Sequence, residues 1–395
     1  ERIRSDQAYA PVNAFMAHHQ GMVMCAITNL LADDLLVERF TRDPRIQITT
    51  LLLSERVPHE LPSELKRLEA IDTSEEDAQR PRIRYSWTPA RRDRPEVQLL
   101  GNGRFSTRIS TAGGGGLRWN NQALTRFVPD ATLDADGFWF YLRDERSERV
   151  WSATQQPTGD NAEQEAITFS THQAQFQRRY HDIHTDLQIT VGASDDIEIR
   201  RLTVTNQSER QRLLRLTSYA EIVLAPPHED ERHPAFSKLF VGSEHVADRS
   251  VLLFKRRARR PEETPPVLLQ AIIGPDGIIK DFAFDTDRRS FIGRNRSTRN
   301  PLGASRPLSN SQGWTLDPVS VFQLSLYLNP GEAKEFCYVT IAAASQEAAL
   351  EVLERHSTQP SIRWICDDAE ADASRAMRRA RIDPSELSLI QSLAA

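Results

Sequence analysis

A period-two alternation of apolar and polar residues runs through most of this chain and constrains its fold more than any other feature. The alternation starts near Val97 and is clear over 105–109, 214–224 and 322–328. Turn-forming residues such as Asn102-Gly103 separate the alternating segments. Because successive side chains of a strand point to opposite faces, each segment is typical of a half-buried strand. Many such strands joined by short turns predict antiparallel sheets packed as a large sandwich.

Helical segments flank the strand-rich region. Apolar residues recur at helical spacing over 14–53, with Asp33-Asp34 and Asp43-Pro44 as breaks between helices or starts of helices. Residues 57–95 are rich in proline and charge and hold few apolar side chains, so we expect a linker there. After the strands we expect three further helices: 346–355 with Ser345 as its cap, 361–381, and one that begins around Pro384. The sequence therefore predicts a mainly β chain with α segments at both ends.

The composition excludes several classes of function. No stretch approaches the roughly 20 uninterrupted apolar residues that a membrane helix needs, so we expect a soluble segment. The 50 basic residues face 55 acidic ones, and the net charge of -5 does not favour a nucleic-acid partner. The three cysteines, Cys25, Cys337 and Cys366, lie far apart and suggest neither a disulfide framework nor a zinc site. We expect no metal and no cofactor, and a reducing, cytosol-like compartment.

The first candidate site is the sequence Ala17-His18-His19-Gln20-Gly21, at the start of the N-terminal helical segment. Adjacent residues of a helix point about 100° apart, so His18 and His19 cannot chelate one metal ion as residues four apart can. They are then either packed structural histidines or part of the polar lining of a sugar-binding cleft. Gln20 carries both a donor and an acceptor, which suits sugar hydroxyls.

The second candidate is the run of four glycines from Gly113 to Gly116, followed by Arg118 and Trp119. A phosphate loop would need Gly-Lys-Ser/Thr at the start of a helix, and a dinucleotide fingerprint would need a strand-turn-helix unit; the run has neither. Four glycines between strands instead predict a tight turn or a close backbone approach, with Arg118 and Trp119 beside it. Trp119 can offer its face to a sugar ring, although a tryptophan in a sandwich more often belongs to the core.

The third candidate is the charged loop 228–240, which contains His233, Lys238 and two phenylalanines. Its density of titratable side chains suits the rim of a site or a subunit contact, and a solvated surface loop is the alternative. Acidic residues are plentiful in the chain, but none stand out as the two carboxyl groups that glycoside chemistry requires. A nucleophile elbow is also missing from the sequence. The residues alone therefore favour a binding or scaffolding role.

Two groups of sequence blocks resemble one protein family. The first group resembles the end of the glucoamylase-like domain of bacterial cyclic β-1,2-glucan synthases: Phe15-Met16-Ala17-His18-His19-Gln20-Gly21-Met22, Asp43-Pro44-Arg45 and Leu51-Leu52-Leu53-Ser54-Glu55-Arg56-Val57-Pro58. The second group resembles the domain that follows it: Leu100-Gly101-Asn102-Gly103-Arg104-Phe105, Ala112-Gly113-Gly114-Gly115, Trp151-Ser152-Ala153, Ser218-Tyr219-Ala220-Glu221 and His233-Pro234-Ala235-Phe236-Ser237-Lys238-Leu239-Phe240. That domain is similar to the amino-terminal β-supersandwich of glycoside hydrolase family 94, the inverting phosphorylases.

The resemblance implies a large, membrane-anchored synthase that combines a glucosyltransferase, a glucoamylase-like region and a phosphorylase-like region that trims β-1,2-glucan. It divides this chain into the last helices of a glucoamylase-like (α/α)6 barrel (1–58), a linker (59–95), a β-supersandwich (96–343) and connecting helices that lead into another (α/α)6 barrel (344–395). In such an architecture both sets of catalytic residues fall outside this chain, which we expect to be a fragment without a complete catalytic site.

The resemblance also implies ligands, partners and a location. The ligands are a β-glucan oligosaccharide and, on the following barrel, inorganic phosphate. A homodimer is one expected assembly, and the parent would reach the cytoplasmic side of the bacterial inner membrane only through its other parts. We expect glucan contacts from seven residues: His18, His19, Gln20, Arg118, Trp119, His233 and Lys238. The alternative, from a different class, is a free-standing carbohydrate-binding or interaction protein.

Overall fold

The computed structural model describes residues 17–43, 46, 86–88, 96–130, 132–260, 263–383 and 386–394. The chain divides into two compact units, Glu1–Thr73 and Ser74–Ala395. In the first unit, helix α1 (Ala17–Leu31) is followed by helix α2 (Leu35–Thr41). Asp33 and Asp34 separate them with φ angles of 46° and 60°, in the left-handed region that interrupts a right-handed helix. These helices and their break confirm the prediction over 14–53 where the structure describes it.

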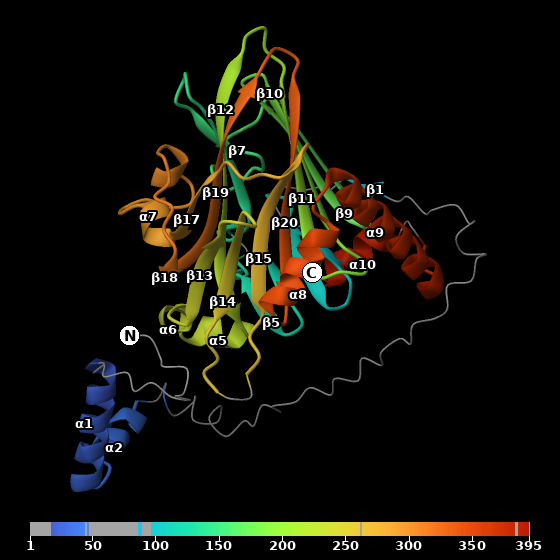
Figure 1. The fold of residues 1–395 in the computed structure, drawn as a ribbon. Coiled ribbons are helices and arrows are strands. Elements are labelled where there is room, and N and C mark those ends of the chain that lie inside the picture. The colour runs from blue at the N-terminus through green and yellow to red at the C-terminus, as the bar shows by residue number, and fades with distance from the viewer. Residues whose placement is uncertain are drawn as a thin grey trace. The chain divides into compact units, whose positions relative to one another are not determined.

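The second unit is built on two large antiparallel sheets (Figure 1). The larger, 11-stranded sheet runs in the order β1 (Ser86–Trp87), β8 (Gln164–Ser170), β9 (Gln173–Tyr180), β10 (Ile183–Val191), β11 (Ile197–Asn206), β20 (Ala333–Ala343), β15 (Val267–Gly274), β14 (Val251–Arg256), β13 (Val241–Val246) and β18 (Gly313–Trp314), with β16 (Gly277–Ile278) beside β15. Strand β1 lies inside the segment 59–95 that was predicted as a linker; most of that segment lies outside the described residues.

The smaller sheet has nine strands. Its order is β17 (Ala283–Asp287), β19 (Pro318–Leu328), β12 (Arg212–Ala225), β5 (Gln122–Thr125), β4 (Gly115–Trp119), β3 (Phe105–Ser110) and β2 (Val97–Gly101), with β6 (Trp139–Asp144) beside β12 and β7 (Val150–Ser152) beside β6. The pairings recorded in both sheets are antiparallel. The predicted mainly β, antiparallel supersandwich is therefore confirmed.

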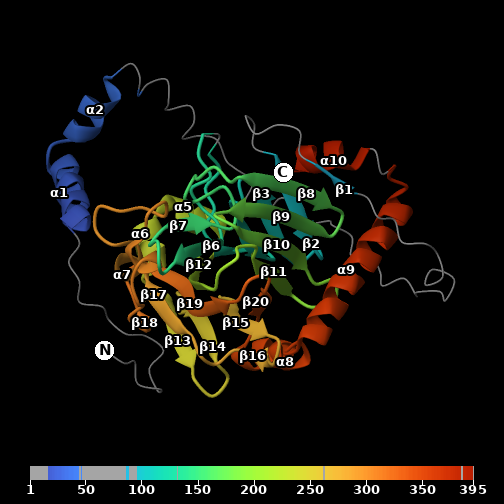
Figure 2. The ribbon, with the colours of Figure 1, turned by 90° about the horizontal axis from the view of Figure 1, so that it is seen from above.

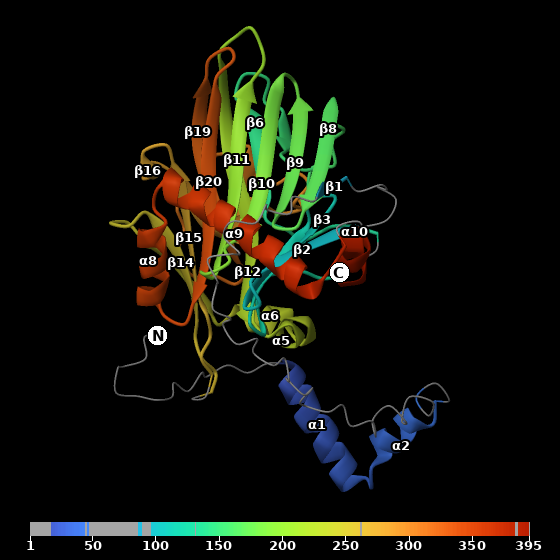
Figure 3. The ribbon, with the colours of Figure 1, turned by 90° about the vertical axis from the view of Figure 1, so that its right-hand side faces the viewer.

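Short and long helices complete the second unit. They are α5 (Pro227–Arg232), α6 (Pro234–Lys238), α7 (Arg288–Ile292), the 3-10 turn η2 (Leu302–Ala304), α8 (Gln346–Arg355), α9 (Gln359–Ala380) and α10 (Leu387–Ala394). The Ser345 hydroxyl accepts a hydrogen bond from the Ala348 N–H, as the predicted cap of α8 requires. Helices α8, α9 and α10 lie on one side of the sheets (Figure 2), and α9 crosses the outer surface of the larger sheet (Figure 3).

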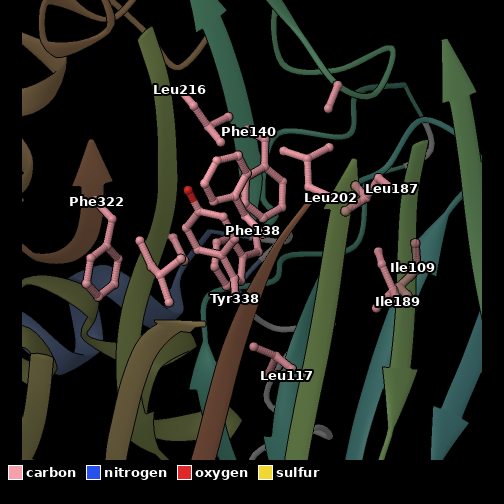
Figure 4. Packing of buried hydrophobic residues seen from close by; sticks show 14 of the residues in the cluster. Ile109, Leu117, Phe138, Phe140, Leu187, Ile189, Leu202, Leu216, Phe322 and Tyr338 are labelled. Atoms are coloured by element: carbon pink, nitrogen blue, oxygen red, sulfur yellow. The ribbon is translucent and has the colours of Figure 1, made fainter. Parts of the chain in front are cut away.

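The main core fills the space between the two sheets. Figure 4 shows Phe138 and Phe140 of the smaller-sheet side against Tyr338 of β20. The Phe140 and Tyr338 ring centroids lie 4.7 Å apart, and those of Phe138 and Phe140 lie 5.2 Å apart. A second apolar layer forms where Leu353 of α8 and Ile365 of α9 pack on the outer face of the larger sheet. Because both faces of the larger sheet are covered at β15, this strand is buried throughout, whereas β8 and β9 alternate between buried and less buried residues.

The glycine run marks a place where the backbone is too crowded for a side chain. A Cβ atom on Gly115 would lie 1.7 Å from the Arg108 carbonyl oxygen, and Gly115 has a φ of +146°. Gly113 has a φ of +90°, and a Cβ there would lie 2.4 Å from the Thr154 Cβ. Only glycine fits both the conformation and the space at these two positions. The expected tight turn and close backbone approach are confirmed.

Candidate functional site

The charged loop 228–240 folds into two short helices, α5 and α6, that contact strand β12 at one end of the sandwich. Each helix has a proline at its start, where the missing N–H costs nothing. The rings of Phe236 and Phe240 meet edge to face at 5.1 Å. The Arg259 guanidinium lies 5.1 Å from the first ring and 5.4 Å from the second. The loop is therefore fastened to the sandwich by its aromatic side chains and by cation–π contacts.

A network of six charged side chains connects these helices to the sandwich, and we call it the charged cluster. Its members are Arg126, Glu221, Asp230, Lys238, Arg288 and Asp317. Arg126 reaches Glu221 at 2.8 Å and holds Asp230 with two bonds of 2.9 and 3.1 Å. The cluster thus joins strand β12 to helix α5 through one guanidinium.

The remaining members extend the cluster toward β17 and α6. Arg288 donates to Glu221 at 2.6 Å, and the Lys238 ammonium lies 2.7 Å from Asp317. Tyr219 donates its hydroxyl hydrogen to Glu221 at 2.8 Å. The side chains of Arg126 and Glu221 are only 11% and 12% exposed, so their attraction is screened less than that of a surface pair.

The charges of the cluster shift the pKa values of Glu221 and of neighbouring groups. Burial alone would raise the pKa of Glu221, but the charges of Arg288 and Arg126 outweigh burial and hold that pKa below its ordinary value. The nearby Asp136 differs, because burial raises its pKa while a hydrogen bond from the Val128 N–H opposes the shift. Burial, with the charge of Glu221 as a further cause, also raises the pKa of Tyr219.

This arrangement suits a structural role, in which ion pairs fix the positions of neighbouring segments, better than a role in proton transfer. A general acid must carry a proton near neutral pH, whereas Glu221 is kept ionised by two guanidinium groups. Glycoside cleavage also needs a second carboxyl group across the scissile bond. Asp230 and Asp317 are instead bound to Arg126 and Lys238. Each of these three carboxylates is engaged with a cation of the cluster.

A cavity of about 200 Å³ opens beside the charged cluster on the outer face of the smaller sheet. We call it the arginine cavity, because its lining includes Arg108, Arg118 and Arg126. Phe127 and Pro227 contribute apolar walls. The cavity and the cluster share Arg126 and Asp230, so helix α5 borders both.

The structure places the seven predicted glucan contacts in different surroundings. Arg118 lines the arginine cavity, and Lys238 belongs to the charged cluster. His233 is exposed at the junction of α5 and α6. The Trp119 indole N–H donates to Asp196 at 2.7 Å, which ties that side chain to the turn after β10.

The remaining three predicted contacts lie in the first unit. His18, His19 and Gln20 are exposed on helix α1, and the two imidazole rings meet edge to face at 4.1 Å. The fold brings Arg118 and Lys238 to the same end of the sandwich through Arg126, which lines the cavity and lies 4.0 Å from the Asp317 partner of Lys238.

Sequence reasoning missed Arg126, Glu221, Arg288 and Asp317 as members of a site. The local pattern gave no signal for Glu221, because it occupies a polar position in the regular alternation between Ala220 and Ile222. The partners themselves could not be inferred, since Arg126 is 95 positions from Glu221 and 104 from Asp230. Such pairs depend on which strands become neighbours in the sheet.

The described residues hold neither a metal-binding cluster nor a single membrane-spanning helix. Within them, no group of three or more His, Cys, Asp or Glu side chains could hold a metal ion. No single helix of the described part is long and apolar enough to cross a membrane. Helices α1 and α2 pass that test only as a pair, by length and composition, and they are bent by 101° at their junction.

The two-sheet architecture and the sequence agree on the class of protein. The family model for the supersandwich domain of glycosyl hydrolase 94 matches residues 80–359. The matched region covers most of the second unit, including both sheets and the charged cluster. The chain belongs to the glycosyl hydrolase 94 supersandwich family, as its sequence blocks indicated.

Among individual proteins, the chain is 30% identical over 396 residues to the cyclic beta-(1,2)-glucan synthase NdvB of Rhizobium meliloti (strain 1021), a match that covers 99% of this chain. It is 26% identical over 251 residues to the N,N'-diacetylchitobiose phosphorylase of Vibrio proteolyticus, covering 62% of this chain. It is 24% identical over 280 residues to the solabiose phosphorylase of Paenibacillus borealis, covering 69%. The chain spans 14% of the synthase and 30% and 35% of the two phosphorylases.

Proposed function

We propose that this chain is part of a protein that synthesises and trims β-1,2-glucan, and that it serves there as a carbohydrate-associated structural domain without a complete catalytic site. The similarity to the glucan synthase over 99% of the chain supports the substrate class. The similarity to two phosphorylases over 251 and 280 residues supports a phosphorolytic parent. The domain division follows from the resemblance: barrel helices (1–58), linker (59–95), supersandwich (96–343) and connecting helices (344–395).

The observation that carries the structural role is the state of the carboxylates in the charged cluster. Glu221, Asp230 and Asp317 each form an ion pair, and the pKa of Glu221 is lowered rather than raised. Phosphorolysis requires a positioned acid together with a phosphate site. We propose that the cluster instead fixes helices α5 and α6, so that this end of the sandwich presents a rigid surface to the rest of the parent.

The proposed ligands and partners follow from the same assignment. β-Glucan oligosaccharides would contact His18, His19 and Gln20 in the first unit and, separately, Arg118, Trp119, His233 and Lys238 in the second. Inorganic phosphate would be consumed on the barrel of the parent. The parent would form a homodimer. It would attach to the cytoplasmic side of the inner membrane through its other parts.

The test is to incubate the purified chain with β-1,2-glucan and inorganic phosphate and to follow the release of glucose 1-phosphate. A full-length phosphorylase of the family serves as the positive control, and a cooperative thermal transition establishes that the chain is folded. We expect no release above a buffer blank. Calorimetric titration with glucan should give a dissociation constant of about 1 mM or weaker, because an exposed surface offers few contacts without an enclosing cleft.

Two results would overturn the proposal. Release of glucose 1-phosphate by the folded chain would place a complete site within it. Binding of the glucan tighter than about 10 µM would require an enclosed binding cleft and a role as an independent carbohydrate-binding protein.

A further inference from the structure

Two arginines of the smaller sheet, Arg108 and Arg118, face the arginine cavity without a carboxylate of their own. In the antiparallel pairing of β3 with β4, Arg108 lies opposite Gly116 and Arg118 lies opposite Ser106. The two arginines are therefore diagonal neighbours on the outer face of the sheet. Among the described residues, neither guanidinium group forms an ion pair or a hydrogen bond, whereas the adjacent Arg126 is bound to two carboxylates.

The walls of the cavity hold Arg108 in position. Its guanidinium carbon lies 5.2 Å from the centre of the Phe127 ring. Phe127 in turn packs on Gly116, where a Cβ atom would lie 2.6 Å from the Phe127 Cβ. The cavity of about 200 Å³ is smaller than the roughly 300–1,000 Å³ typical of sites for drug-sized ligands, so it suits a small ligand.

The nearby acids do not neutralise this pair. Asp230 is engaged by Arg126, and Glu231 is exposed at the rim of the cavity. Asp134 and Asp136 line a neighbouring cavity on the other side of Arg108. Burial, and after it the positive charge of Arg118, lowers the pKa of Arg108. Arg108 is partly buried and Arg118 is exposed beside it. The two like charges repel each other, and an anion placed between them reduces that repulsion.

We propose that the arginine cavity binds a phosphate group between Arg108 and Arg118, either as inorganic phosphate or as the ester of a small sugar. Guanidinium groups match the oxygens of phosphate with paired hydrogen bonds, and charge-assisted bonds of this kind are strong. Ser106 also lines the cavity and offers a hydroxyl group to a third oxygen. This site lies on the supersandwich itself and does not depend on the substrate or the catalytic role proposed above.

The experiment uses the full 395-residue chain at low salt, titrated by calorimetry in separate arms with inorganic phosphate, glucose 1-phosphate and glucose. We expect millimolar or tighter binding of at least one phosphate and no measurable binding of glucose. A preference between the first two ligands distinguishes free phosphate from a sugar ester. Binding of glucose as tight as that of its phosphate, or no phosphate binding up to about 20 mM, would overturn the proposal.

Four variants locate the site. Arg108→Gln and Arg118→Gln should each weaken phosphate binding at least about tenfold. The matched control is Arg146→Gln, which removes the same charge from an exposed turn away from the cavity and should change affinity less than about twofold. Glu231→Gln removes a competing negative charge at the rim, so it should tighten binding.

The outcomes are decisive even if one arginine variant fails to fold, because Glu231→Gln acts in the opposite direction. Tighter binding in that variant, with loss in the arginine variants, supports the site. Equal affinity in all four variants, or a loss in Arg146→Gln as large as that in Arg108→Gln, would show nonspecific attraction to the surface and overturn the assignment.

Discussion

Helices α1 and α9 belong to the same chain but differ in what covers their apolar side chains. On α1 no residue is buried, and Leu30 and Leu31 are 81% and 80% exposed. On α9, Ile362 and Ile365 are 1% and 3% exposed, because they pack on the larger sheet. Burial of an apolar side chain contributes about 1.5–3 kcal/mol to stability. Packing on the sheet therefore stabilises α9, whereas α1 receives no such stabilisation from the described residues.

The ion pairs of the two units differ in the same way. Arg42 and Glu38 of the first unit meet at 3.3 Å with side chains 76% and 60% exposed. Arg126 and Glu221 of the sandwich meet at 2.8 Å and are almost fully covered. Exposed pairs of this kind contribute little, whereas a covered pair is costly to break. Stability in this chain is therefore concentrated in the second unit.

The largest effect should come from a buried isoleucine of α9. Ile365→Ala removes three carbons from the layer between α9 and the larger sheet and leaves a cavity, so it should lower the free energy of unfolding by about 2–5 kcal/mol. Leu30→Ala is the matched control on α1 and should change it by less than about 0.5 kcal/mol. Urea unfolding followed by far-ultraviolet circular dichroism, which detects loss of helix and strand in both units, measures both. Equal effects of the two changes would abolish the contrast between the helices.

A smaller effect is expected from the charged cluster. Glu221→Gln leaves Arg126 and Arg288 facing a neutral group in a covered position, so it should cost about 2 kcal/mol of unfolding free energy. Glu38→Gln breaks only the exposed pair with Arg42 and should cost less than about 0.5 kcal/mol. The same urea experiment compares the two variants. A Glu221→Gln protein as stable as the parent would mean that the cluster does not hold the α5–α6 end.

The smallest of these effects is a change with pH. Because the folded-state pKa of Glu221 is lowered, its ionised form stabilises the protein above the unfolded value of about 4.3. That contribution is lost as the pH falls through the lower folded value. The stability difference between the parent and Glu221→Gln should therefore be greatest near pH 7 and shrink below about pH 4. Unfolding measured across this range by circular dichroism checks the trend.

Asp136 serves as a control, because its pKa shift, and therefore its effect on stability as the pH changes, has the opposite sign to that of Glu221. Burial raises its folded-state pKa, so the ionised form costs stability above that value and the cost disappears as the pH falls. Relative to Asp136→Asn, the parent should gain stability on acidification. If the stability differences of both variants changed with pH in the same direction, local charge and burial would not determine the pKa values of these two carboxyl groups.

The architecture was predictable from sequence because local patterns determine it. The alternation over 105–109 fixes which residues of β3 point inward, and Ser345 marks the start of α8. The glycine run also shows locally that backbone crowding is required. In each case the signal lies within a few residues of the feature that it predicts.

The candidate site was much less predictable because it depends on contacts between distant segments. Arg118 and Lys238 were selected from sequence, but Arg108 and Arg126 were not. Yet Arg108 and Arg126 line the arginine cavity together with Arg118. Trp119 was selected for its ring, yet its indole N–H is committed to Asp196 from another strand connection. The order of the strands in the sheet determines which arginines lie next to carboxylates. Local sequence patterns do not reveal that order.

The central claim is that the sandwich is held together by its own buried core, whereas helix α1 lacks a cover among the described residues. Hydrogen–deuterium exchange on the intact 395-residue chain tests it directly, because protection reports the free energy of local opening. We predict that amides of α1 and α2 exchange at nearly the rate of an unfolded peptide, whereas those of β10, β11 and β20 are protected up to the free energy of global unfolding. Protection of α1 equal to that of β11 would contradict the account, since it would require the apolar face around Leu30 and Leu31 to be buried.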